Sequence, residues 1–221
     1  IFRYVFGGAV AHLGGVSYVD FVVPGFVTTG VLFTGMGAAS GVAEDVQSGF
    51  VDRLRSLPIA RSSLVAGRMV ADAGLLAWGL VVTTAAGFAV GFRLHGSVAG
   101  GAAALGLCLL YGLAFDALFV TSGLYAGSAQ AAQGTSFLVF PLSFVSSAYV
   151  PVSTMPSWMQ PVARWQPMTA MVDSVRILAD GPATARTLGH PLHEYLLLSL
   201  AWCAVLLVVF VPLAAARFRS S

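Results

Sequence analysis

Residues 195–216 read YLLLSLAWCAVLLVVFVPLAAA, a run without a charged side chain. A helix needs about 20 apolar residues to cross the hydrocarbon core of a bilayer, so this run predicts a membrane-spanning helix. The rest of the 221-residue chain has the same character, since 57% of its residues are hydrophobic and 9% are charged. An average soluble domain has roughly 25% charged residues. The composition therefore excludes a disordered chain, a disulfide scaffold and a cytosolic enzyme.

Further uncharged stretches lie on the N-terminal side of this run. The stretch 117–163 is too long for one helix, and Gly and Gln residues between positions 123 and 134 suggest a break in it. We expect an all-α, polytopic membrane protein in which residues 1–221 form a single transmembrane domain. The predicted spans are about 21–43, 70–92, 98–122, 135–151 and 195–216, with the remnant of a truncated first span at about 1–12.

The arginines orient these predicted spans, because basic residues are enriched in cytoplasmic loops. If the segment 44–68 is cytoplasmic, the inner side holds more arginines than the outer side. The inner set is Arg53, Arg55, Arg61, Arg68, Arg217 and Arg219, and the outer set is Arg93, Arg164, Arg176 and Arg186.

The segment 44–61, EDVQSGFVDRLRSLPIAR, is not a span but has an apolar stripe at helical spacing. Its acids come first and its arginines late, an order that suits the dipole of a helix over about 44–57. This helix either docks on a soluble partner or lies on the lipid surface, and its narrow stripe with mixed charge favours a protein groove. The candidate contact residues are Glu44, Asp45, Gly49, Phe50, Arg53, Leu54, Leu57 and Pro58.

The segment 153–191 is also not a span, because several prolines break it into short pieces. Trp158 suits the headgroup level of a membrane. A further helix is plausible from Met168, and on it Asp173 and Arg176 are three residues apart and can pair. We interpret the segment either as a helical hairpin that dips into the outer leaflet or as an amphipathic loop on the surface. Its candidate structural residues are Pro156, Trp158, Pro167, Asp173 and Arg176.

The sequence predicts no catalytic, cofactor or metal site on this chain. It contains no lysine, and a Walker A loop needs a lysine on the nucleotide phosphates. The motif HPLHE at 190–194 is not the zinc-binding HExxH arrangement. Asp116 is the acid that lies well inside an apolar run. It either pairs with an arginine or the backbone near the inner end of its helix, or has a proton or substrate role.

Two long stretches resemble the permeases of type-2 ABC exporters. GVAEDVQSGFVDRLRSLPIARSSLVAGRMVAD (Gly41–Asp72) is similar to their cytoplasmic segment, through Glu44, Gly49, Leu54, Leu57, Pro58, Arg61 and Gly67. FPLSFVSSAYVPVSTMPSWMQPVARWQPMTAMVDSVRIL (Phe140–Leu178) resembles their second signature, through Pro141, Ser143, Pro151, Pro156, Trp158, Pro167, Thr169, Asp173 and Arg176. Phe2–Ala9 and Val19–Gly25 look like the daunorubicin/doxorubicin-resistance branch.

This resemblance implies a six-span permease that works as a homodimer with a separate ATPase subunit on the cytoplasmic side. The helix at about 44–57 would be the coupling helix, and the segment 153–191 an outer re-entrant hairpin. ATP and Mg would bind the ATPase subunit rather than this chain. The expected place is the cell membrane of a high-GC bacterium, and no nucleic-acid partner is expected.

The expected activity is export of a hydrophobic drug or lipid-like compound. Two alternatives remain open at this point. One is a polysaccharide or lipid-linked glycan exporter of the same architecture. The other is a transporter that works without an ATPase, for which Asp116 is the available intramembrane ionisable group.

Overall fold

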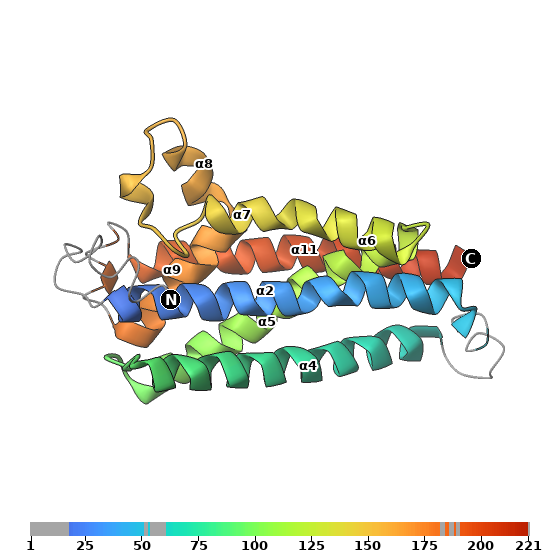
Figure 1. The fold of residues 1–221 in the computed structure, drawn as a ribbon, viewed down its shortest axis with the longest axis horizontal. Coiled ribbons are helices and arrows are strands. Elements are labelled where there is room, and N and C mark those ends of the chain that lie inside the picture. Colours follow the sequence, from blue (N-terminus) through green and yellow to red (C-terminus); the bar gives the residue numbers. More distant parts are fainter. Residues whose placement is uncertain are drawn as a thin grey trace. The chain divides into compact units, whose positions relative to one another are not determined.

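The computed structural model describes residues 18–50, 53, 61–181, 184, 185, 188 and 191–220. Every regular element in these ranges is helical, which confirms the predicted all-α class (Figure 1). The longer elements are α2 (Tyr18–Gln47), α4 (Arg61–Val90), α5 (Val98–Tyr125), α9 (Pro167–Asp180) and α11 (Leu192–Ser220). The shorter elements are α6 (Ala129–Ser136), η1 (Phe137–Val139), α7 (Phe140–Phe144), η2 (Val152–Thr154) and α8 (Gln160–Trp165).

Four helices in the described ranges are long and apolar enough to cross a membrane. They cover Val19–Gln47, Gly67–Val90, Val98–Tyr125 and Leu192–Arg217. A helix satisfies all its internal backbone hydrogen bonds, which the hydrocarbon core of a bilayer requires. The expectation of a polytopic helical membrane protein is therefore confirmed.

The helical region that follows α5 differs from the predicted span at 135–151. It begins at Ala129 and passes through α6, η1 and α7 to Phe144. Ser128 sets its start, because the Ser128 side chain accepts a hydrogen bond from the backbone N–H of Ala131. Such an N-cap satisfies an amide that has no partner within the helix.

The end of α2 also differs from the prediction. We expected a separate helix to begin at Glu44, but α2 continues to Gln47, and Gly49 then adopts a left-handed φ of 69°. Glycine tolerates this conformation because it lacks a Cβ atom. Glu44 and Asp45 therefore belong to the last turn of α2, where the helix dipole disfavours negative charge. The acids at this end need a cation from elsewhere in the chain.

The chain divides into two compact units. Unit 1 consists of Ile1–Gly30, Leu80–Cys108 and Leu142–Leu200. Unit 2 consists of Val31–Gly79, Leu109–Pro141 and Ala201–Ser221. Each of the four long apolar helices contributes one part to each unit.

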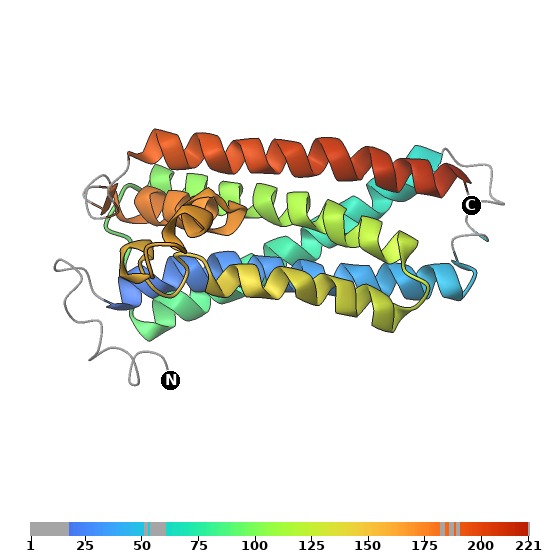
Figure 2. The same cartoon turned by 90° about the horizontal axis from the view of Figure 1, so that it is seen from above.

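In unit 1, α9 is buried on all sides rather than along one stripe. Its residues from Met168 to Ile177 are all buried, although three of them are Asp173, Ser174 and Arg176. α9 lies beside the first part of α11, where the hydroxyl groups of Ser174 and Ser199 are 3.1 Å apart (Figure 2). The expectation of an amphipathic loop lying on the surface does not describe this helix.

Unit 2 has an apolar core formed by Ala38, Val42, Val120, Leu124 and Ala214. The helical region from α6 to α7 contributes to this unit up to Pro141, and its Phe140 ring lies 5.5 Å from the Phe33 ring of α2. Gln47 donates a hydrogen bond to the Gly127 carbonyl at 2.9 Å. These contacts hold the later part of α2 against the segment that follows α5.

Glycines allow close approach of backbones at particular positions. A Cβ atom on Gly100 of α5 would collide with the Leu178 carbonyl of α9, both in unit 1. In unit 2, a Cβ atom on Gly123 would collide with the Ala39 carbonyl of α2. Gly106 and Gly127, in contrast, face open space. Glycine is therefore required sterically at some of these positions and not at others.

We expect Gly100→Ala to destabilise the protein, since the added methyl group meets backbone that cannot move aside. Overpacking of this kind costs about 1–3 kcal/mol. Gly106→Ala on the same helix is the matched control, and it should keep or raise stability because alanine is the better helix former. Thermal unfolding of the two purified variants in detergent measures the difference. Equal melting temperatures would contradict the contact.

Candidate functional site

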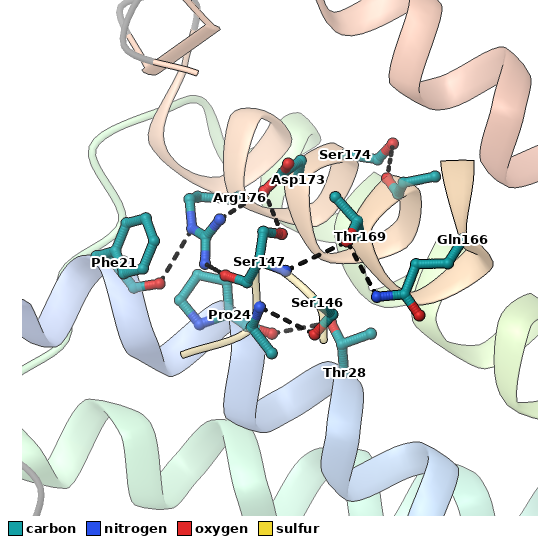
Figure 3. A network of polar contacts seen from close by, with 12 residues as sticks. Phe21, Pro24, Thr28, Ser146, Ser147, Gln166, Thr169, Asp173, Ser174 and Arg176 are labelled. Atoms are coloured by element: carbon teal, nitrogen blue, oxygen red, sulfur yellow. Dashed lines mark hydrogen bonds and ion pairs between the residues drawn. The ribbon is translucent and has the colours of Figure 1, made fainter. Parts of the chain in front are cut away.

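A buried polar network in unit 1 joins α9 to α2 and to the turn at 145–149. Arg176 is 1% exposed and donates to three acceptors (Figure 3). Its Nη1 lies 2.6 Å from Asp173 Oδ1, its Nε lies 3.0 Å from the Phe21 carbonyl, and its Nη2 lies 3.0 Å from the Ser147 carbonyl. The guanidinium also stacks on the Phe21 ring, 3.8 Å from its centroid. The predicted ion pair between Asp173 and Arg176 is present.

The network satisfies Asp173 as well as Arg176. The Ser147 hydroxyl donates to Asp173 Oδ1 at 2.7 Å, and the Ser147 N–H donates to Thr169 Oγ1 at 3.2 Å. Burial raises the pKa of the Asp173 carboxyl, whereas Arg176 and the hydrogen bond from Ser147 act in the opposite direction. A buried ion pair is stable when its remaining polar atoms are hydrogen-bonded in this way. The network therefore anchors α9, and we assign it a structural role.

The remaining residues of the predicted outer segment lie around this anchor. Pro167 is the first residue of α9, a position where the missing N–H of proline costs nothing. Trp158 is 73% exposed, and its place at the headgroup level stays a prediction. Pro156 lies between η2 and α8, and α8 leads through Gln166 directly into α9 (Figure 1).

A second ionisable group of unit 1 lies at the end of α9. Asp180 is buried, and its Oδ1 lies 3.8 Å from His95 Nδ1. Burial raises the pKa of the Asp180 carboxyl to about 6, with the neighbouring charge of Asp20 acting in the same direction and His95 and Arg176 opposing it. This carboxyl therefore takes up a proton more readily in the folded protein than in the unfolded chain.

The predicted partner-contact residues begin at the end of α2 in unit 2. Phe50 is 49% exposed and Val46 is 38% exposed. The backbone N–H of Arg53 donates to the Gly49 carbonyl at 3.1 Å. The predictions for Leu54, Leu57 and Pro58 lie outside the described residues.

Arg68 of α4 places a cation at the acidic end of α2. Its Nη1 lies 3.2 Å from Asp45 Oδ2, and its Nε lies 2.7 Å from Asp72 Oδ2. Its Nη2 reaches the Ala38 carbonyl at 3.5 Å. Arg68 thus joins the last turns of α2 to the early turns of α4.

The sequence pattern of the ABC-2 type transporter family matches residues 1–179. The chain belongs to this family. The ABC-2 permease is 30% identical over 221 residues to the daunorubicin resistance ABC transporter permease protein DrrB1 of Streptomyces coeruleorubidus, covering all of this chain and 75% of that protein. It is 27% identical over 214 residues to the probable doxorubicin resistance ABC transporter permease protein DrrC of Mycobacterium tuberculosis, covering 96% of this chain and 73% of that protein.

These comparisons confirm the family and branch suggested by the sequence. The relatives are named as permeases, which are the membrane subunits of transporters. The chain shares with them the membrane domain of this family. Both relatives come from actinobacterial genera, which supports the expected high-GC origin.

Sequence reasoning missed several members of the anchor network. Phe21 contributes a carbonyl and a ring face, which no side-chain motif reports. Ser147 donates a hydrogen bond to Asp173 from a turn, where no sequence pattern marks it as a partner of that residue. Gln166 donates to the Val145 carbonyl at 2.7 Å. The signal that could have found Gln166 is its place directly before the proline that begins α9.

Removing one partner of the Asp173–Arg176 ion pair should destabilise the protein more than removing both partners. Arg176→Gln leaves the Asp173 charge buried without its partner, a loss of about 3–5 kcal/mol. The double variant Arg176→Gln with Asp173→Asn should recover part of that loss, since no charge remains to be buried. Thermal unfolding in detergent measures both, and Arg164→Gln at an exposed position of α8 is the control. A double variant less stable than Arg176→Gln would contradict this role.

The raised pKa of Asp180 predicts a pH dependence. Because the folded state holds this proton more tightly, the contribution to stability is complete below the ordinary aspartate pKa and is lost as pH rises through about 6. Asp180→Asn should reduce the loss of stability between pH 4 and pH 6.5, while Glu194→Gln at an exposed position should leave it unchanged. Parallel curves for Asp180→Asn and the unmodified chain would argue against the assignment.

Proposed function

We propose that this chain is the permease subunit of an ATP-driven exporter that moves a hydrophobic drug or lipid-like compound out of the cell. The family match and the names of both relatives support this function. ATP and Mg would bind a partner ATPase subunit on the cytoplasmic side. The absence of lysine from the sequence supports this division, because a Walker A loop requires one.

Exposed apolar side chains on α4 and α11 support the view that these helices contact lipid or a second copy of the chain. Val70 of α4 is 73% exposed, Trp78 of α4 is 69% exposed and Val208 of α11 is 72% exposed. Soluble proteins rarely expose contiguous apolar patches of this kind. We propose a homodimer in the cell membrane, with part of these faces against lipid.

The observation that carries the coupling role is the exposed apolar end of α2 beside the Arg68 ion pairs. An ATPase subunit would contact Phe50 and the neighbouring residues of the segment 44–58. A displacement of this segment would be transmitted to α4 through the ion pairs of Arg68 with Asp45 and Asp72. Coupling of two sites requires such contacts to differ between two states of the transporter.

We expect Phe50→Asp to uncouple transport from ATP hydrolysis while the chain still inserts. A charge at a half-exposed position disturbs an apolar docking surface more than it disturbs folding. ATP-dependent uptake into inside-out vesicles containing the permease and its co-purifying ATPase should fall at least tenfold, a change that corresponds to about 1.4 kcal/mol. Phe50→Leu, which keeps the apolar character, is the matched control.

Co-purification from native membranes separates docking from cargo recognition. The unmodified chain and Phe50→Leu should retain an ATPase subunit on an affinity column, and Phe50→Asp should lose it. Full export by Phe50→Asp, with its ATPase retained, would contradict the docking role. Stimulation of ATP hydrolysis by a lipid-linked glycan rather than by an apolar dye would favour the glycan-export alternative.

A further inference from the structure

Unit 2 contains a cavity of about 280 Å³ among α2, α4 and α5. Most of its wall is apolar or small, including Gly37 and Ala38 of α2 and Leu76 of α4. Its polar groups are Arg68, Asp72 and Asp116 together with Thr34. Apolar pockets with a few converging polar groups are the usual form of a small-molecule site.

Asp116 is the unusual member of this wall. Its side chain is 1% exposed, and neither carboxylate oxygen has a hydrogen-bond donor in the part of the chain that the structure describes. An ionised carboxylate inside a membrane-spanning helix is costly and points to function. Asp173 is just as buried, yet it has Arg176 and Ser147 as donors. Burial alone therefore does not explain the state of Asp116.

The charges around the cavity do not balance. Arg68 is the cation that acts on Asp116, and Asp72 is the neighbouring acid. Arg68 is already engaged by Asp72 at 2.7 Å and by Asp45 at 3.2 Å. The guanidinium thus contacts Asp45 and Asp72 and acts on Asp116 without a direct hydrogen bond, so Asp116 lines the cavity beside Asp72 with no cation of its own. A further positive charge inside the cavity would complete the group.

The walls favour an organic cation over a metal ion. Among the described residues, no three His, Cys, Asp or Glu side chains are grouped so as to hold a metal ion. Divalent cations such as Ca²⁺ also require about six to eight oxygen ligands. A protonated amine needs one or two carboxylates, and its carbon atoms gain contact with apolar walls such as Leu76. Pockets for whole drug-sized ligands measure about 300–1,000 Å³, so this cavity suits a small amine or the amine-bearing end of a larger molecule.

We propose that this cavity binds a protonated organic amine, with Asp116 as its counter-ion and the Leu76 side of the cavity against its carbon atoms. The meaning of the site for transport rests on the proposed export function, because an amine held there would be cargo. The binding itself requires neither ATP nor the ATPase subunit. A failed binding experiment would therefore leave ATP-driven export standing, and a failed export experiment would leave the site standing.

The test uses the full chain in lipid nanodiscs without an ATPase, with empty nanodiscs as the blank. Cyclohexylammonium and cyclohexanol are probes of nearly equal shape that differ in charge at pH 7. Calorimetry should show at least tenfold tighter binding of the ammonium probe by the unmodified chain. Asp116→Asn should lose this preference, while Asp20→Asn, which removes a buried acid of unit 1, should keep it.

A third variant covers the case in which Asp116→Asn does not fold. Gly37 lines the cavity and has open space where its Cβ atom would lie, so Gly37→Leu should fill the cavity and weaken both probes without changing any charge. Equal affinity of the unmodified chain for the two probes would overturn the proposal, and would indicate that a proton neutralises Asp116. An unchanged ammonium preference in a folded Asp116→Asn variant would overturn it as well.

Discussion

The bilayer imposes the main constraint on this chain, because its hydrocarbon core offers no water to unpaired backbone groups. Helices satisfy their own amides and carbonyls, and the long apolar segments of this protein accordingly form α2, α4, α5 and α11. The same constraint applies to side chains, since each buried polar atom must find a partner within the protein. Buried polar side chains with partners are assigned a structural role, and a buried polar side chain without a partner is a candidate functional residue.

The Arg176 cluster of unit 1 and the Asp116 cluster of unit 2 differ in how their buried charges are paired. In unit 1, Arg176 and Asp173 are paired and hydrogen-bonded, which fixes the largely buried α9. In unit 2, Arg68 is shared by two acids while Asp116 faces a cavity without a donor. A satisfied pair gives rigidity, whereas an unsatisfied carboxylate gives the site an affinity for cations. This contrast is the physical basis for assigning a structural role to one cluster and a binding role to the other.

The position of Arg68 connects the two activities proposed for unit 2. Its contact with Asp45 lies at the end of α2, close to the exposed Phe50, and its contact with Asp72 lies on the wall of the cavity. A displacement of the segment after α2 would therefore change the electrostatic surroundings of Asp116.

The sequence by itself determined the helical class, the membrane location, the family and the spacing that pairs Asp173 with Arg176, because these depend on composition and on residues close together in the chain. It did not show that Phe21, 155 residues before Arg176, completes the anchor, or that Asp116 borders a cavity with Arg68 and Asp72. It also placed Glu44 and Asp45 at the start of a helix rather than at the end of α2. The physical reason is that α2 and α5 are apolar on all sides, so periodicity does not reveal which faces meet. Only the packing of the helices decided which polar groups found partners.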